Sequence, residues 1–208
     1  LSPMEGGFTV GVLVQCNYGT RSQLRIAGIP VGREVTGLEP CVAQRLDPPL
    51  TAFDGRPLPV CGAGPGGGDA PAEDPEQGSI IIVVATDAPL SPDQLKRVVR
   101  RVALGMGRMG SINGNGSGDI FIAFSTANRG VDWGNSGRST LPAPTMQRLG
   151  SGLVDPLFTA TVEATEEAII NAMLAAETMT GADYRRAWAL PHDQVKAILA
   201  KYNRVQRR

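Results

Sequence analysis

Ser79 has the surroundings of a nucleophile at the start of a β-strand. It follows Gly78 and begins the apolar run Ser79-Ile-Ile-Ile-Val-Val-Ala-Thr86. An unbroken apolar run of this length is typical of a strand that is covered on both faces. If the bond between residues 78 and 79 breaks, Ser79 gains a free α-amine beside its hydroxyl, and this amine can act as the base. The junction therefore predicts the chemistry of a self-cleaving N-terminal nucleophile.

The residues before Ser79 favour cleavage at this junction. Residues 62–78 are polar and rich in glycine and proline, a composition that cannot bury a core and predicts a disordered linker. Gly78 has no side chain to block attack on its carbonyl carbon. Taken alone, Ser79 is better explained as the ordinary first residue of a strand. Its combination with Gly78, the linker and the lack of a suitable histidine base favours the nucleophile.

His192 is the only histidine of the chain, which excludes several kinds of site. It stands beside the start of an expected helix, where a capping or surface role suits it. A Ser-His-Asp triad would have to use this residue, and it is far from any Gly-x-Ser-x-Gly motif. A histidine-rich metal site is impossible, and no Cys-x-x-Cys pair occurs. We therefore expect neither a metal nor another cofactor.

Three polar residues could assist Ser79. Ser117 and Asp119 come just before an expected strand, and their i, i+2 spacing places both side chains on one face of an extended segment. A tight polar turn is the alternative explanation for them. Asn17 comes just after another expected strand, where its amide could be an ordinary turn group or an oxyanion donor.

Two glycine-rich motifs resemble ligand loops but predict no ligand. Residues 105–110 match Gly-x-Gly-x-x-Gly, yet they follow a helix and precede a strand, which reverses the order of a dinucleotide-binding loop. Residues 113–119 place oxygen-bearing side chains at alternate positions, as a calcium loop does. Only Asp119 among them is a carboxylate, and Phe124 stands where the bidentate glutamate would be.

The elements that must position these residues alternate between apolar strands and amphipathic helices. Strands are expected over residues 8–16, 80–85, 120–124 and 157–162, with a short hairpin over 23–35. A helix begins after Ser91, with Pro92 at its first position and Gln94 completing a capping box, and ends at Gly105. Further helices are expected over 163–179 and 193–202. This order predicts layered α/β packing in a single domain of residues 1–208.

The composition is that of an ordinary globular protein without a marked charge. The 208 residues carry 20 basic and 20 acidic side chains, so neither nucleic acid nor an acidic membrane is an expected partner. No apolar run reaches the roughly 18 residues of a membrane-spanning helix, and the first residues lack the pattern of a signal peptide. Cys16, Cys41 and Cys61 are expected as reduced thiols in the cytoplasm, with a Cys41–Cys61 disulfide as the alternative.

Seven runs of sequence together resemble one known family. The chain is similar to the DmpA/BapA family, the L-aminopeptidase/D-esterases and β-peptidyl aminopeptidases, over nearly its whole length outside the linker. The matching runs are Gly11–Gly19, Gly28–Gly32, Gly78–Leu90, Gln94–Arg97, Leu104–Arg108, Asn115–Asn128 and Glu166–Asn171.

The resemblance implies a fold, a maturation step and a set of roles. The fold is an αββα sandwich of the DmpA/ArgJ-like type. The precursor cleaves itself into an α chain, here residues 1–78, and a β chain, here 79–208, whose first residue Ser79 is the nucleophile. The family's assisting hydroxyl and carboxylate correspond to Ser117 and Asp119, and its oxyanion amide corresponds to Asn17. Some members have Glu where this chain has Asp119.

The resemblance also implies the substrates and the assembly. Substrates would be short peptides, amino-acid amides or esters, and the enzyme would be a homo-oligomer. Family precursors carry a long segment before the strand at 8–16, which predicts a partial sandwich here and a separate N-terminal polypeptide as a partner. Two alternatives remain open at this point: an acyltransferase similar to the ornithine acetyltransferases, which use Thr as the nucleophile, and an inactive truncated chain or assembly partner.

Overall fold

The computed structural model describes residues 1–2, 5–52, 54–62, 78–128 and 145–205. The chain divides into two compact units, each assembled from three segments. Unit 1 comprises Leu1–Gln15, Ile80–Gly107 and Asp119–Ile169, and unit 2 comprises Cys16–Ser79, Arg108–Gly118 and Ile170–Arg208. The predicted linker over 62–78 lies, except for its two end residues, outside the described residues.

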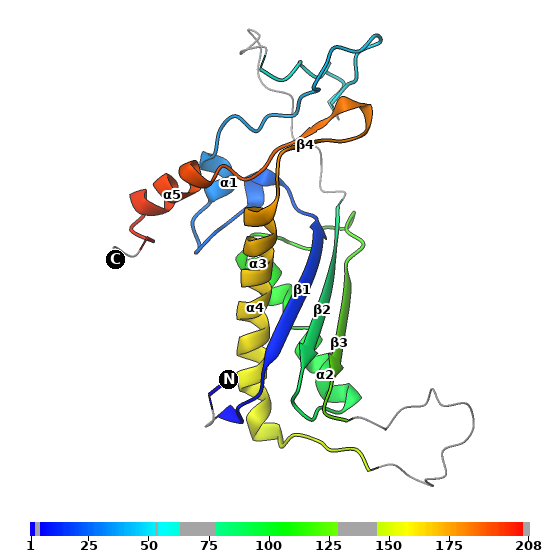
Figure 1. Cartoon of the computed structure of the whole chain (residues 1–208), viewed down its shortest axis with the longest axis vertical. Coiled ribbons are helices and arrows are strands. Elements are labelled where there is room, and N and C mark those ends of the chain that lie inside the picture. Colours follow the sequence, from blue (N-terminus) through cyan, green and yellow to red (C-terminus); the bar gives the residue numbers. More distant parts are fainter. Residues whose placement is uncertain (3–4, 53, 63–77, 129–144, 206–208) are drawn as a thin grey trace, which may run out of the picture. The chain divides into compact units, whose positions relative to one another are not determined.

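A three-stranded sheet is the frame of the fold. Its strands are β1 (Val10–Asn17), β2 (Ser79–Thr86) and β3 (Ile120–Ser125), in the order β1-β2-β3. The central strand β2 pairs with β3 in parallel, from Ile81 opposite Ile120 onward. In Figure 1, β1 runs in the opposite direction, so β1 ends at the edge of the sheet where β2 and β3 begin. These three strands confirm the predicted ones over 8–16, 80–85 and 120–124.

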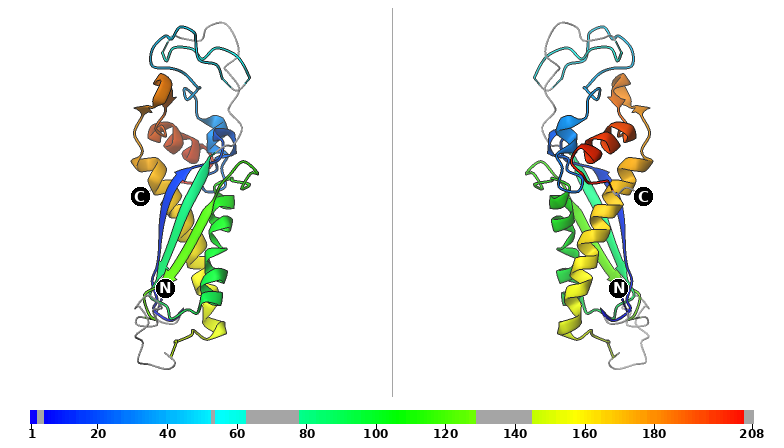
Figure 2. Two further views of the ribbon diagram at one scale, coloured as in Figure 1. Left: turned by 90° about the vertical axis from the view of Figure 1, so that its right-hand side faces the viewer. Right: turned by 90° about the vertical axis from the view of Figure 1, so that its left-hand side faces the viewer.

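The two faces of the sheet differ in burial. Ile80, Ile82 and Val84 of β2 are fully buried, because helices cover their face of the sheet (Figure 2). On the other face, large apolar side chains stay exposed in the described part of the chain: Leu13, Ile81, Ile120, Ile122 and Phe124. Alternate residues of a strand point to opposite faces, so one helical layer buries only every second residue. The prediction that β2 is covered on both faces is therefore wrong here.

The predicted helix after Ser91 is confirmed at its start but is interrupted. α2 spans Pro92–Val99, and Gln94 Oε1 accepts a hydrogen bond from the Ser91 backbone N–H at 3.2 Å, as a capping box requires. α3 follows at Val102–Arg108. The Gly-x-Gly-x-x-Gly motif therefore starts within a helix, which agrees with its rejection as a nucleotide loop.

Residues 157–162 are helical, so the predicted strand there is wrong. They belong to α4 (Val154–Ala175), which also takes up most of the predicted helix over 163–179. The run Leu-Phe-Thr-Ala-Thr-Val is rich in strand-forming residues. Its threonines are accommodated because the Thr161 and Thr165 hydroxyls donate to the carbonyls four residues earlier, at 2.7 Å each. Burial of one face of the helix outweighs the intrinsic preference.

Unit 2 contains short elements joined by turns. The predicted hairpin over 23–35 is reduced to one bridge between Ile26 and Ile29, and is flanked by η2 (Arg21–Gln23) and α1 (Val31–Glu34). The predicted last helix is confirmed as α5 (His192–Lys201). The remaining elements are β4 (Met179–Thr180), η4 (Ala182–Tyr184) and β5 (Arg186–Ala187), while η3 (Ser151–Leu153) belongs to unit 1.

The expected reduced state of the cysteines is wrong for two of the three. Cys41 and Cys61 form a disulfide, with Cα atoms 5.2 Å apart. A bridge between Val42 and Val60 aligns the two segments and brings the thiols together. Cys16 is the free cysteine, and its half-burial raises the pKa of its thiol. Since paired cysteines do not indicate a reducing compartment, the cysteine argument for the cytoplasm is lost.

Candidate active site

Ser79 lies at the first position of β2, where its hydroxyl receives a backbone hydrogen bond. The Gly118 N–H donates to Ser79 Oγ at 3.1 Å, within unit 2. Ser79 is exposed, so its hydroxyl is open to a substrate. The parallel pairing of β2 and β3 explains the contact, because Ser79 and Gly118 each lie two residues before the first paired residues, Ile81 and Ile120.

Gly118 is a functional candidate that the sequence analysis missed. It lies between Ser117 and Asp119, which were singled out for their side chains, and its contribution is a backbone N–H. A Cβ atom built at this position would approach Ser79 Oγ to 3.1 Å, closer than most real Cβ contacts. A glycine one residue after Ser117 in a Gly-rich turn was the available signal, but the sequence does not show where a backbone amide points.

Gly78 is packed against the end of β1. A Cβ atom built on Gly78 would lie 1.8 Å from the Asn17 carbonyl oxygen and 2.7 Å from the Tyr18 Cα, which no side chain can tolerate. The chain therefore needs glycine immediately before Ser79 for a steric reason. The same contact places the backbone of Asn17 beside the 78–79 junction. The oxyanion role of the Asn17 side-chain amide stays a prediction.

Asp119 contacts the residue that follows Ser79. In unit 1, Asp119 Oδ1 accepts a hydrogen bond from the Ile80 backbone N–H at 3.2 Å. This bond fixes the carboxylate at the start of β3 and ties it to the start of β2. The observed geometry thus gives Asp119 a positioning contact with β2, the strand that begins at Ser79.

Ser117 lies in the turn that precedes β3. Its backbone N–H donates to the Gly114 carbonyl oxygen at 2.9 Å, and the residue is half-buried. This turn agrees with the structural alternative, a tight polar turn, and it also sets the position of the next residue, Gly118. The role predicted for the Ser117 hydroxyl stays a prediction.

The structure thus brings together the backbones of Asn17, Gly78 and Ser79, and joins Ser79 to Gly118. His192 is the first residue of α5, which agrees with its expected place at a helix start. Among the residues that the structure describes, no group of three or more His, Cys, Asp or Glu side chains could hold a metal ion. This arrangement provides an exposed serine that directly follows a glycine and whose hydroxyl accepts a hydrogen bond from a backbone N–H.

The chain matches known proteins over most of its length. A model of peptidase family S58 covers residues 1–187. The chain is 45% identical over 203 residues to the beta-peptidyl aminopeptidase BapA of Sphingosinicella microcystinivorans, covering 97% of this chain and 46% of that protein. The chain therefore spans about half the length of the curated relatives it matches.

Two solved structures share the fold. A beta-aminopeptidase from Burkholderia sp. aligns with a TM-score of 0.72 and 32% identity, covering 97% of this chain and 46% of that one. The L-aminopeptidase D-Ala-esterase/amidase from Ochrobactrum anthropi, described as a variant of the Ntn hydrolase fold, aligns with a TM-score of 0.70 and 35% identity, covering 96% and 45%. The predicted fold class, layered α/β of this sandwich type, is confirmed.

Proposed function

The chain belongs to peptidase family S58, and on that premise we propose that it is a self-processing serine aminopeptidase with Ser79 as its nucleophile. The observation that carries the proposal is the hydrogen bond from the Gly118 N–H to Ser79 Oγ, on a serine that follows a sterically required glycine. The relatives reported above are named as aminopeptidases, so the acyltransferase is not proposed.

The first stage breaks the bond between Gly78 and Ser79. Ser79 Oγ attacks the Gly78 carbonyl carbon, and the peptide nitrogen leaves as the new α-amine of Ser79, so that an ester joins the two residues. Water then hydrolyses the ester, which releases Gly78 with a carboxylate and regenerates the hydroxyl. The close approach of Gly78 to the Asn17 backbone supports this stage, because it leaves only glycine at the residue whose carbonyl carbon is attacked.

The second stage is aminopeptidase turnover. Ser79 Oγ attacks the carbonyl carbon after the first residue of a short peptide, an amino-acid amide or an ester, and an acyl-enzyme forms as the amine or alcohol leaves. Water completes the reaction. The α-amine of Ser79 accepts the hydroxyl proton, and Ser117 and Asp119 assist it. A model α-amine has a pKa of roughly 7.7–8.0, so activity should rise as the pH approaches 8 and the amine loses its proton.

Two donors are proposed for the negative charge of the intermediate. The Asn17 side-chain amide is one, since the Asn17 backbone lies against Gly78. The Gly118 N–H is the other, because it lies 3.1 Å from Ser79 Oγ, within reach of an oxygen on the carbon that Ser79 attacks. Donors fixed in place before the reaction stabilise an oxyanion without reorganisation.

The proposed assembly involves further copies or a further chain. We propose a homo-oligomer, with a separate N-terminal polypeptide as an additional partner. The exposed apolar face of the sheet supports this proposal, because a contiguous patch of large apolar side chains is typical of an interaction surface. In the described part of the chain, no helix is long and apolar enough to cross a membrane.

Mass spectrometry tests the function. Purified chain should convert into two fragments, one ending at Gly78 and one beginning at Ser79, and the mixture should hydrolyse amino-acid p-nitroanilides. Ser79→Ala should remain intact and inactive, while Ser79→Cys should keep measurable cleavage. A Ser79→Ala chain that still splits between residues 78 and 79 would contradict the nucleophile. An intact wild-type chain would contradict the self-processing step and would favour an inactive assembly partner.

A further inference from the structure

Unit 2 contains a cavity that shares no lining residue with the site at Ser79. Its volume is about 480 Å³, within the range of small-molecule sites in proteins. The walls come from three stretches of the chain that are distant in sequence, and most of the lining side chains are apolar. Trp188 and Leu190 are two of these apolar side chains.

Three arginines line the same cavity, and none of the described acidic residues does. They are Arg21, Arg185 and Arg186. Two of them are held by backbone carbonyls, since Arg21 Nη1 donates to Val35 O at 3.4 Å and Arg185 Nη2 donates to Thr51 O at 3.2 Å. A mostly apolar cavity with three positive charges and no acid in its lining favours an anionic ligand.

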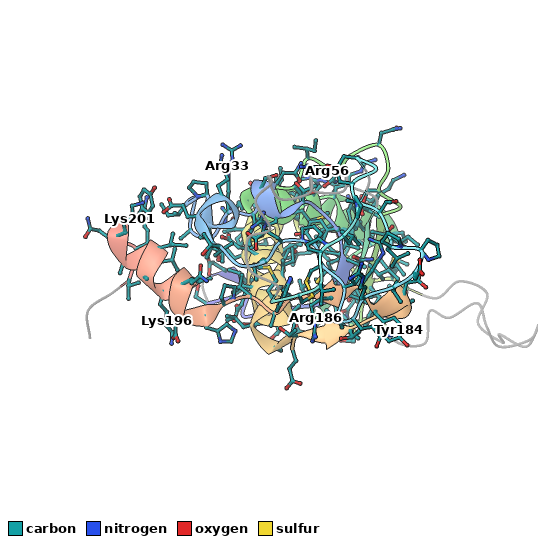
Figure 3. All side chains as sticks on the ribbon, turned by 90° about the horizontal axis from the view of Figure 1, so that it is seen from above. Arg33, Arg56, Tyr184, Arg186, Lys196 and Lys201 are labelled. Carbon is teal, nitrogen blue, oxygen red and sulfur yellow. A yellow bond between two sulfur atoms is a disulfide. The ribbon has the colours of Figure 1, made fainter. Side chains whose placement is uncertain are left out.

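Arg186 is the residue that indicates where the charge of a ligand would bind. It lies on β5 and is labelled in Figure 3. Its Nε atom is buried and has no hydrogen-bond partner among the described residues. Buried donors are nearly always paired in folded proteins, so the unpaired Nε marks Arg186 as an arginine whose donors the described residues do not fully satisfy. Its guanidinium lies 5.8 Å from the centre of the Trp188 ring, which supplies a flat apolar surface next to the charge.

We propose that this cavity binds a small carboxylate that carries an apolar group. The carboxylate accepts hydrogen bonds from the Arg186 guanidinium, whose planar set of donors matches a carboxylate. The apolar group lies against Trp188 and Leu190. Such a ligand places its charge at Arg186 and its apolar group against the apolar walls of the cavity. Both a free carboxylic acid and the carboxyl end of a peptide have this chemistry.

The disulfide supports one wall of the cavity. Cys41 lines this wall, and the Cys41–Cys61 disulfide joins its segment to a second segment of the chain. The two segments also share a hydrogen bond from the Val42 N–H to the Pro59 carbonyl oxygen. Leu58, on the second of these segments, is another lining residue. The disulfide therefore limits how far this wall can move. A wall that is already ordered in the free protein loses less conformational entropy when a ligand binds.

Calorimetric titration of the 208-residue chain tests the proposal with two pairs of probes. The first pair is 3-phenylpropionate and its neutral amide. The second is N-acetyl-Ala-Phe and its C-terminal amide, whose blocked amine keeps them from being aminopeptidase substrates. We expect each acid to bind at least about tenfold more tightly than its amide, since hydrogen bonds to a charged group are lost in the amide. The stronger of the two acids identifies the source of the carboxylate.

Variants then locate the binding. Arg186→Gln should weaken binding of the acids about tenfold, and Arg186→Lys should lose less because it keeps the charge. Arg45→Gln removes an exposed arginine that does not line the cavity, and should leave binding unchanged. Ser79→Ala should also bind normally, which separates this site from the proposed function.

Three results would overturn the proposal. One is equal affinity of the wild-type chain for an acid and its amide, a comparison that needs no variant and does not depend on variant folding. Another is wild-type affinity in Arg186→Gln with an unchanged circular dichroism spectrum. The third is no saturable binding of either acid at millimolar concentration.

Discussion

The contacts of single residues limit which residue types can stand at the proposed site. Ser79 needs a hydroxyl for the proposed chemistry, and Gly118 supplies only a backbone N–H to that hydroxyl. Residue 78 has to be glycine, because a Cβ atom built there would lie only 1.8 Å from the Asn17 carbonyl oxygen. Each of these demands can be tested by one substitution.

At Asn17, removing the amide should reduce catalysis without affecting the fold. Asn17→Ala should lower kcat by about 10²–10³, the usual cost of losing one oxyanion donor. The residue is exposed, so the melting temperature should stay near that of the wild type. Asn17→Asp is the matched control, because it keeps the shape but removes the donor, and it should be at least as slow. Wild-type kcat in both variants would rule out the role of the side chain.

At Gly78, adding a methyl group should disturb the start of β2. Gly78→Ala must displace the backbone of Asn17 or of residue 78 itself, since the built Cβ lies 1.8 Å from the Asn17 carbonyl oxygen. We expect slower fragment formation by mass spectrometry and a lower melting temperature. Gly107→Ala is the control, because a Cβ there meets nothing within 4 Å. Equal cleavage rates in the two variants would contradict the steric argument.

At the scale of elements, Gln94 links α2 to the chain segment before α4. It is fully buried, its Oε1 accepts from the Ser91 backbone N–H, and its Nε2 donates to the Leu149 carbonyl oxygen at 2.8 Å. Gln94 therefore caps the start of α2 and also fixes a segment that is distant in the sequence. The sequence pattern predicted the first of these contacts and could not show the second.

Replacing Gln94 should therefore destabilise unit 1. Gln94→Ala should lower the free energy of unfolding by about 2 kcal/mol, because it leaves a buried N–H and a buried carbonyl without partners. Urea denaturation followed by circular dichroism measures this change. Lys96→Ala, on the exposed side of the same helix, is the control and should change the stability little. A loss for Gln94→Ala no larger than that of the control would contradict the structural role.

At the scale of the whole molecule, the sheet exposes one apolar face. Ile122 and Phe124 of β3 are 50% and 46% exposed, and Leu13 of β1 is 71% exposed. The chain spans about half the length of its curated relatives. The proposed assembly would depend on this exposed apolar face. An interaction at this face would also explain why the side chains of β2 are apolar on both faces, although the described helices cover only one of them.

This face should make the 208-residue chain associate with itself. Ile122→Thr keeps a β-branched residue but removes apolar surface, and should raise the concentration for half-association about tenfold. Sedimentation equilibrium measures it. Ile112→Thr makes the same change at an exposed position outside the sheet, is the control and should have little effect. A chain that stays monomeric at all concentrations, with or without the substitution, would contradict the proposed homo-oligomer.

The sequence by itself determined the local features of this protein. Apolar runs with β-branched residues predicted β1, β2 and β3, the Ser91–Gln94 pattern predicted the start of α2, and the Gly78–Ser79 junction with its flanking motifs indicated the family. These features depend on residues close together in the chain, so periodicity and composition report them.

Only the tertiary structure decided the features that depend on distant residues. Burial against the sheet made residues 157–162 helical, although their composition favours a strand. Alignment of two loops paired Cys41 with Cys61, and the parallel register of β2 and β3 directed the Gly118 N–H at Ser79 Oγ. In each case the deciding partner is separated along the sequence, and a backbone donor has no residue type by which a sequence could reveal its direction.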